Sequence, residues 1–243
     1  MKKILLTTLL ASMAFSAVAA DKIRFASSAT YPPFESLNKN NQIEGFDIDL
    51  AKAVCKQIDA ECSFTNNPFD SLIPALKFRR YDAVISGMDI TAERSKQVDF
   101  TQPYYSNSAI LIAEKDTYTS PEQLKGKRVG VENGTTHQKY LQEKYPDVII
   151  VAYDSYQNAI LDLKNHRLAG VFGDTAVVNQ WLKSYPELGT VGKHITDSQY
   201  FGRGLGIAVR KGNAELLARF NDALKTLRTN GTIEQINQRW FPE

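Results

Sequence analysis

The sequence lacks the residues and motifs on which most metal and cofactor chemistry depends. Its 243 residues include only 3 His and 2 Cys, and His137, His166 and His194 follow no metal-ligand spacing. It has no G-x-S-x-G, no G-x-x-x-x-G-K-[ST] and no H-E-x-x-H pattern. We therefore expect neither a metal ion nor a cofactor.

The chain also has no excess of charge of either sign. It has 29 Lys+Arg against 27 Asp+Glu, and Lys2 and Lys3 lie in a segment that we expect to be removed, which leaves 27 of each. Binding to nucleic acid needs a surplus of basic residues, so no nucleic-acid partner is expected. After the N-terminus, no apolar run reaches about 18 residues, so we expect no membrane insertion.

The N-terminal residues are typical of a secretory signal. Residues 1–3 carry a positive charge from Lys2 and Lys3, residues 4–15 are mostly apolar, and residues 17–19 are the small side chains that a signal peptidase requires. We expect a signal peptide over residues 1–19, with cleavage after Ala20 as the alternative. A buried N-terminal helix is the competing interpretation. The mature protein is then exported, and we infer a periplasmic location.

The two cysteines, Cys55 and Cys62, are seven residues apart. In an oxidising compartment such a pair is most simply a disulfide. A reactive or metal-binding pair is less favoured because no His lies nearby. We expect the pair to have a structural role.

Strand and helix patterns alternate along the chain, which favours an α/β protein with largely parallel sheets. We expect Asp47 and Asp70 to cap the first two helices. The predicted strands are 23–26, 82–86, 128–131, 148–152 and 170–173, and the predicted helices are 48–57, 71–78, 135 onward, 156–165, 175–182 and 214–227.

Two extended segments, 106–113 and 202–209, are interpreted as crossings between two lobes. On this reading lobe I comprises residues 20–107 and 203–243, and lobe II comprises residues 108–202. Ligands of open α/β sheets bind at the carboxyl ends of the strands, so the cleft between the lobes is the expected site.

Polar side chains follow several predicted strands and match the two ends of an amino-acid zwitterion. Arg94 can hold a carboxylate with a two-pronged hydrogen bond, and Thr135 and Thr136 open a helix whose N–H groups favour the same anion. Asp89 and Asp174 can receive an ammonium group. Singly, each has a plainer explanation, such as a surface ion pair or a helix cap.

Tyr31 and Phe69 also follow predicted strands and can sandwich a flat side chain. Packing in the core is the alternative for Phe69. Together with the polar groups, these rings predict a pocket for a free amino acid.

Five segments carry a specific resemblance. TYPPFES, GFDIDLAKAVCKQ, FDSLIPALKFRRYDAVISGMDITAERS, GKRVGVENGTTHQKYL and GVFGDTAVV resemble the polar amino-acid-binding proteins of ABC importers, the arginine-binding members above all, over essentially the whole mature chain. The resemblance implies a two-lobed periplasmic binding fold of type II, each lobe a sheet flanked by helices, joined by two hinge strands. It also implies an inner-membrane permease as partner and a Cys55–Cys62 disulfide.

The same resemblance gives roles to the candidate ligand residues. Tyr31 and Phe69 flank the ligand side chain. Arg94, with Thr135, Thr136 and the backbone near Gly87, holds the α-carboxylate. Asp174, with Asp89 and the Ser86 carbonyl, receives the α-ammonium. We also count His137 among the candidate ligand-binding residues, without a role from the resemblance.

One position departs from the family pattern. Relatives that bind lysine, arginine and ornithine commonly have an aspartate three residues before the stacking tyrosine, and here that residue is Ser28. We expect Glu132 to replace it as the partner of a basic side chain, with Glu35 as second candidate. Asp89, Asp174 and Glu132 against Arg94 leave a pocket charge of about −2, or −1 if Glu132 points away, which favours a cationic ligand because unpaired buried charge is costly.

The sequence therefore predicts a monomeric periplasmic solute-binding protein, not an enzyme, that captures L-arginine and delivers it to an ABC permease. A binding protein for a broader set of basic amino acids is one alternative. An exported enzyme on the same fold, similar to an amino-acid dehydratase, is another, with Glu132 or His137 as the acid or base. A sensor that docks on a membrane receptor is the third.

Overall fold

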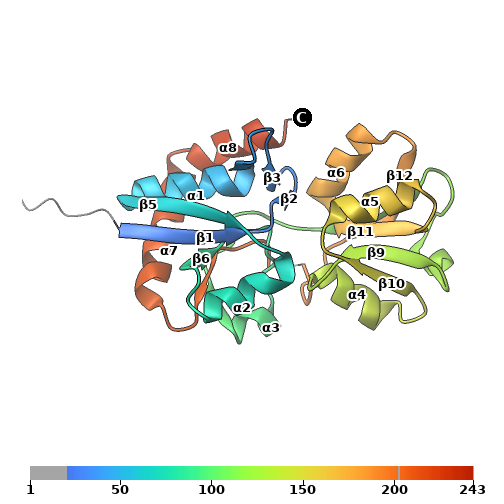
Figure 1. The fold of residues 1–243 in the computed structure, drawn as a ribbon, viewed down its shortest axis with the longest axis horizontal. Coiled ribbons are helices and arrows are strands. Elements are labelled where there is room, and N and C mark those ends of the chain that lie inside the picture. The colour runs from blue at the N-terminus through green and yellow to red at the C-terminus, as the bar shows by residue number, and fades with distance from the viewer. Residues whose placement is uncertain (1–20, 202, 243) are drawn as a thin grey trace, which may run out of the picture.

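A computed structural model describes residues 21–201 and 203–242, which form two lobes lying side by side (Figure 1). The predicted signal peptide lies outside the described residues. Across those residues no helix is both long and apolar enough to cross a bilayer.

The first lobe contains a five-stranded sheet with the order β5-β1-β6-β13-β7 and a small three-stranded sheet with the order β2-β3-β4. Its elements are β1 (Asp21–Ser27), β2 (Thr30–Tyr31), β3 (Glu35–Leu37), β4 (Ile43–Glu44), α1 (Phe46–Gln57), β5 (Ala60–Asn66), the 3-10 helix η1 (Phe69–Ser71), α2 (Leu72–Lys77), β6 (Ala83–Val84), α3 (Ala92–Ser95), β7 (Val98–Phe100), β13 (Ala208–Arg210), α7 (Ala214–Thr229) and α8 (Thr232–Trp240).

The two faces of this sheet are covered by different helices, as the alternation of side chains along β1 requires. Phe25 points to the face covered by α1 and α7, where its ring stacks on Phe220 with centroids 5.8 Å apart. The next residue, Ala26, points to the opposite face and packs in one buried cluster with Leu72 and Leu76 of α2.

The second lobe contains a five-stranded sheet with the order β10-β9-β11-β8-β12. Helix α4 covers one face, and α5 and α6 cover the other (Figure 1). Its elements are β8 (Ala109–Glu114), the 3-10 helix η2 (Pro121–Leu124), β9 (Arg128–Glu132), α4 (Thr136–Lys144), β10 (Ile149–Tyr153), α5 (Tyr156–Lys164), β11 (Gly170–Asp174), α6 (Thr175–Ser184) and β12 (Leu188–Ile195).

Each large sheet is mixed, so the expectation of largely parallel sheets is wrong in part. The pairs β1–β5, β1–β6, β9–β10 and β9–β11 are parallel, whereas β13 and β8 run antiparallel to both of their neighbours. The reason is that β8 and β13 are the first strands after the chain crosses from one lobe to the other. They therefore begin at the boundary between the lobes and run opposite to the strands that end there.

The two segments that connect the lobes lie against each other. Leu205 N donates to the Tyr105 carbonyl at 2.9 Å, and Tyr104 N donates to the Leu205 carbonyl at 2.9 Å. These bonds form isolated bridges instead of a long ladder, and Leu205 also bridges to Asp89. Gly202 lies outside the described residues. The lobe boundaries at residues 107/108 and 202/203 stay a prediction.

Two predicted helix caps are wrong. Helix α1 starts one residue before Asp47, and its N-cap is Gly45, so the Asp47 carboxylate is turned inward and accepts a hydrogen bond from Gly87 N at 2.7 Å. Helix α2 has Ser71 as its N-cap, and the Asp70 carboxylate instead accepts from Asn133 Nδ2 of the other lobe at 2.8 Å. Aspartate is favoured at helix starts, but Asp47 and Asp70 instead accept hydrogen bonds from residues far away in the sequence.

The predicted disulfide is confirmed. Cys55, near the end of α1, is bonded to Cys62 on β5, with their Cα atoms 6.2 Å apart. The bond joins a helix to the edge strand of the sheet that the helix covers, at the end of the lobe away from the boundary.

Removing this bond is expected to lower stability. Replacing both cysteines with serine, C55S/C62S, should reduce the free energy of unfolding by about 2–3 kcal/mol, because a short closed loop restricts the unfolded chain by roughly that amount. Denaturant unfolding with and without reductant measures the effect. The double variant is the control, since its unfolding should not respond to reductant. Two free thiols in the mass spectrum of the non-reduced protein would refute the prediction.

Candidate ligand-binding site

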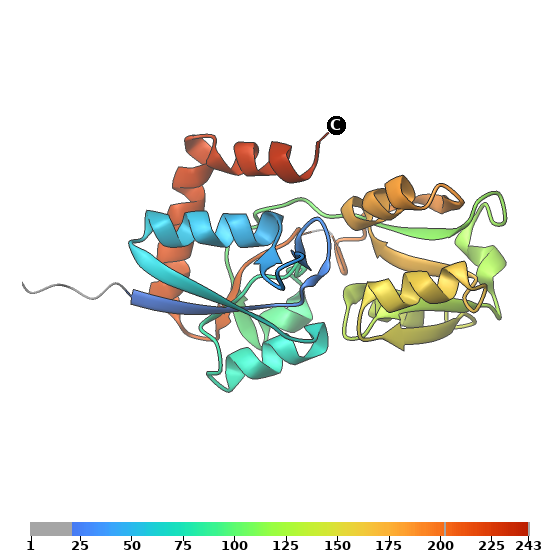
Figure 2. The same cartoon turned by 45° about the horizontal axis from the view of Figure 1, so that its top comes forward.

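A small pocket, lined by residues of both lobes, lies between the two lobes. Strands β1 and β5 point from the outer end of the first lobe toward the second lobe (Figure 2). The pocket is lined by Ser28, Tyr31, Glu35, Phe69, Gly87, Asp89, Arg94, Glu132, Thr135, Thr136, His137 and Asp174.

Most of the lining residues follow the carboxyl ends of parallel strands. Ser28 follows β1, Gly87 and Asp89 follow β6, and Glu132 and Asp174 are the last residues of β9 and β11. The structure therefore brings together eleven of the twelve residues predicted from the sequence. The exception, Ser86, is not part of the lining, whereas Glu35, the second candidate partner of a basic side chain, is. The role of the Ser86 carbonyl stays a prediction.

Tyr31 connects the lobes inside the pocket. Its hydroxyl donates to Asp174 Oδ2 at 2.8 Å and accepts from the Asp174 backbone N at 3.0 Å. Its ring stacks on that of Tyr156, with centroids 5.2 Å apart. Burial, together with the nearby Asp174 carboxylate, raises the pKa of Tyr31 well above its usual value. The ring is held by Tyr156 on one side and by Asp174 at its hydroxyl.

Two buried carboxylates, Asp89 and Asp174, form an acidic end of the pocket. Asn107 Nδ2 donates to both, at 2.7 Å each, and the Thr136 hydroxyl donates to Asp89 Oδ2 at 2.6 Å. His137 Nε2 lies 3.0 Å from Asp174 Oδ1. Burial and the neighbouring Asp174 raise the pKa of Asp89 to about 6. The two carboxylates offer several acceptors to one ammonium group.

Asn107 was missed by the sequence reasoning. It lies in the first connecting segment, which the sequence predicts only as an extended crossing between the lobes. The signal that could identify Asn107 is its polar side chain in a segment that passes by the predicted cleft.

Arg94 lies where the first lobe meets the start of α4. Its guanidinium donates to the Asp89 carbonyl at 3.1 Å and to the Gly134 carbonyl at 3.2 Å, and its central carbon is 5.3 Å from the centroid of the Phe69 ring. Burial lowers the pKa of Arg94, but an arginine stays charged at neutral pH. Thr135 caps α4 by accepting from Gln138 N at 3.3 Å. A cation and a helix N-terminus thus meet at one end of the pocket.

Glu132 lies on the pocket wall and is 3% exposed. The hydroxyls of Ser28 and Thr30 donate to its Oε1, at 3.5 and 3.4 Å. Burial raises the pKa of Glu132 to about 8. In the pocket without a ligand, Glu132 is therefore mostly protonated at neutral pH. Asp89 and Asp174 against Arg94 then leave a charge of about −1, not the −2 obtained by counting Glu132 as ionised.

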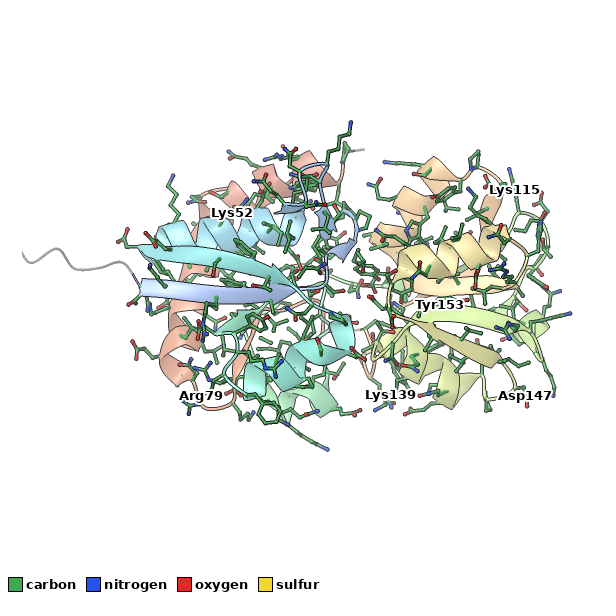
Figure 3. All side chains as sticks on the ribbon, in the orientation of Figure 1. Lys52, Arg79, Lys115, Lys139, Asp147 and Tyr153 are labelled. Carbon is green, nitrogen blue, oxygen red and sulfur yellow. A yellow bond between two sulfur atoms is a disulfide. The ribbon has the colours of Figure 1, made fainter. Side chains whose placement is uncertain are left out.

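Further contacts join the lobes outside the pocket. Asp70 accepts from Asn133, as described above, and Lys139 of α4 pairs with Glu93 of α3. Figure 3 labels Lys139 near the boundary between the lobes. At Gly134, φ is +74° and an added Cβ would lie 2.9 Å from Asp70 Cβ, so only glycine fits this close approach. The lobes are closed on each other around the pocket.

In the described part of the chain, no three His, Cys, Asp or Glu side chains are grouped so as to hold a metal ion. The arrangement instead presents a cation and a helix N-terminus, a pair of carboxylates, two aromatic rings and a further buried acid. This set is suited to binding an amino acid through its two charged ends and its side chain.

Comparison with known proteins identifies the family. Residues 23–243 match the family described as bacterial extracellular solute-binding proteins, family 3, and the chain belongs to it. This confirms the family resemblance predicted from the sequence.

Three similar proteins illustrate the relationship. The chain is 65% identical, over the full length of both, to the Escherichia coli K12 protein named ABC transporter arginine-binding protein 1. It superposes with a TM-score of 0.89 and 52% identity on a Salmonella typhimurium periplasmic binding protein whose structure is described as the basis for high arginine specificity, covering 91% of this chain and 100% of that one. The third protein, an ancestral amino-acid-binding protein described as a precursor of cyclohexadienyl dehydratase, has 33% identity and a TM-score of 0.83, covering 90% of this chain and 95% of that one. The fold is the predicted type II periplasmic binding fold.

Proposed function

We propose that the protein is a periplasmic solute-binding protein that captures L-arginine between its lobes and delivers it to the permease of an ABC transporter. It acts as a monomer, after removal of its signal peptide. The single observation that carries this proposal is the buried pocket in which Arg94 and the start of α4 lie at one place, the Asp89–Asp174 pair at another, and Glu132 on the wall. The names of the relatives support the choice of ligand.

The α-carboxylate of the ligand is bound by Arg94 and the N-terminus of α4. The guanidinium offers two parallel N–H donors, and the first N–H groups of a helix favour an anion. Thr135 and Thr136 stand at this helix start and are both buried. Closure of the lobes completes the site, because Arg94 belongs to the first lobe and α4 to the second.

The α-ammonium is bound by Asp174 and Asp89. Both carboxylates are buried, and the raised pKa of Asp89 reflects this burial and the nearby charge of Asp174. A cation bound between the two acids relieves their repulsion. Asn107, which donates to both, holds their oxygens in a fixed geometry.

The guanidinium of the ligand lies between Tyr31 and Phe69 and pairs with Glu132. A planar cation stacks on aromatic faces, and a carboxylate accepts its forked donors. Ser28 and Thr30, which already donate to Glu132, orient this acid. Ser28 thus supports Glu132 instead of supplying the charge that an aspartate at its position would carry.

We expect the order of preference L-arginine, then L-lysine, then L-glutamine. Lysine keeps the charge but loses the stacking, which is worth roughly 0.5–2 kcal/mol per ring, and glutamine loses the charge. Competition against labelled arginine tests the order. Displacement of arginine by equal concentrations of lysine or glutamine would refute it. Lysine and ornithine competing equally would favour the broader basic amino-acid carrier.

We further propose that the protein is a carrier and not an enzyme. One relative is an amino-acid-binding protein described as a precursor of a dehydratase, so an enzyme on the same fold is the alternative to be tested. Prolonged incubation of the protein with arginine, followed by NMR of the ligand, tests this proposal. Recovery of unchanged arginine is the expected result, and any product formed in proportion to protein would overturn it.

A further inference from the structure

Two acidic side chains meet behind the pocket wall. Glu35 comes from β3 and Asp47 from the first turn of α1, and both are 0% exposed. Glu35 also reaches the pocket lining, whereas Asp47 does not. Neither is needed as a direct partner of the ligand in the proposed function, so their burial calls for another explanation.

If Glu35 and Asp47 are both ionised, one oxygen of each carboxylate has no hydrogen-bond donor. Glu35 Oε1 accepts from the Ser86 hydroxyl at 2.9 Å, and Asp47 Oδ2 accepts from Gly87 N at 2.7 Å and from the Tyr104 hydroxyl at 2.8 Å. The remaining oxygens, Glu35 Oε2 and Asp47 Oδ1, are buried and have no donor. Two adjacent buried carboxylates that are both ionised, each with one oxygen that has no donor, are strongly unfavourable.

We propose that Glu35 and Asp47 share one proton, and that the resulting hydrogen-bonded pair positions the ends of β1 and β6 for ligand binding. A proton between Glu35 Oε2 and Asp47 Oδ1 gives both orphaned oxygens a partner, and the pair carries one negative charge instead of two. Glu35 and Asp47 are positioning residues, since they act through the residues that they hold.

The pair is joined to the pocket wall by a continuous chain of bonds. The Ser86 hydroxyl, which donates to Glu35, accepts from Ser28 N at 2.8 Å. Gly87, whose N–H is held by Asp47, has φ of +49°, and an added Cβ would lie 3.2 Å from the Tyr31 ring. The pair therefore fixes the backbone on which the proposed side-chain subsite depends.

The electrostatic surroundings favour a bound proton. Besides each other, the ionisable groups that act on the pair are Glu132 from β9, through its charge on Glu35, and Tyr104 from the first connecting segment, through its hydrogen bond to Asp47, and neither is basic. Burial and the Asp47 charge raise the pKa of Glu35 well above its usual value, and burial raises the pKa of Asp47 to about 6. These directions agree with the count of donors.

The test compares Asp47→Asn with Asp47→Ala, because Asp47 does not line the pocket. An asparagine amide donates to Glu35 and its carbonyl accepts from Gly87 and Tyr104, so D47N reproduces the bonds of a protonated Asp47 without a titrating group at that position. At pH 7 we expect D47N to bind arginine within about twofold of wild type, and D47A to bind about tenfold or more weakly, as for a buried group left without its partner. D47A losing no more affinity than D47N would overturn the positioning role.

A second measurement uses no ligand. Because the folded protein keeps a proton that the unfolded chain releases above about pH 4.5, wild-type thermal stability should fall as pH rises through 6 and beyond. Glu132 and Asp89 titrate in both proteins, so the difference between wild type and D47N isolates the pair. We expect a steeper fall for wild type, and parallel profiles would overturn the shared proton.

The affinity comparison rests on the proposed function, whereas the stability comparison does not. If wild type fails to bind arginine, the proposed function is wrong, and the pH profiles of the ligand-free proteins still decide whether the proton is shared.

Discussion

Arg94→Ala is expected to weaken L-arginine binding by roughly a hundredfold or more while the protein stays folded. Charge-assisted hydrogen bonds contribute about 1.5–3 kcal/mol each, and the truncation also leaves the ligand carboxylate without its cation. In the closed structure the guanidinium bridges the lobes by donating to the Asp89 and Gly134 carbonyls. The variant therefore loses both a ligand contact and a closure contact. Calorimetric titration with arginine measures the loss.

Two controls separate charge, geometry and closure at this position. Arg94→Lys keeps the cation but not the fork, and we expect intermediate affinity. Lys139→Ala removes a nearby cation that pairs with Glu93 across the lobes but does not line the pocket, and it should change affinity by less than about fivefold because exposed pairs contribute about 0–1 kcal/mol. If R94A titrates like wild type, the carboxylate assignment is wrong.

Glu132→Gln is expected to weaken arginine binding by about ten- to a hundredfold, the range for loss of a buried charge-assisted pair. The substitution keeps the shape of the side chain and an acceptor for Ser28 and Thr30, but removes the charge. L-Citrulline is the matched ligand, since it replaces the guanidinium with a neutral group of similar shape. Wild type should strongly prefer arginine to citrulline, and E132Q should lose most of that preference. An unchanged preference would exclude Glu132 as the guanidinium partner.

The same variant should change the pH dependence of binding. Burial raises the pKa of Glu132 to about 8, so below pH 8 the acid must release its proton before it pairs with the guanidinium. Wild-type affinity for arginine should therefore rise with pH by up to about tenfold per unit and level off above pH 8. E132Q should lose this part of the rise, and titration at pH 6 to 9 measures it. A wild-type affinity that falls over this range would contradict the expected proton release.

Much of the site could be predicted because its charged residues lie just after predicted strands. Arg94, Asp89 and Asp174 all follow predicted strands, and the carboxyl ends of parallel strands meet at one edge of a sheet. Local patterns locate those ends to within a few residues. The family resemblance then assigned the ends of a zwitterion to them, and the pocket lining contains these residues.

Other features depended on contacts between segments far apart in the chain. Asp47 has the residue type and place of a helix cap, yet its carboxylate is turned toward Gly87 and Tyr104, 40 and 57 residues away. Asn107 gained its role only because two lobes place Asp89 and Asp174 on either side of it.

The amino-acid sequence alone determined the two-lobed α/β class, the residues at the strand ends and the cysteine pair, because periodicity, strand-end position and residue type are local properties. Only the tertiary structure decided the direction of β8 and β13, the closure around the pocket and the raised pKa values of Glu132 and Glu35. Strand direction follows from where the connecting segments enter each sheet. The pKa of a carboxyl follows from its burial and its neighbours, and those are defined only when both lobes are in place.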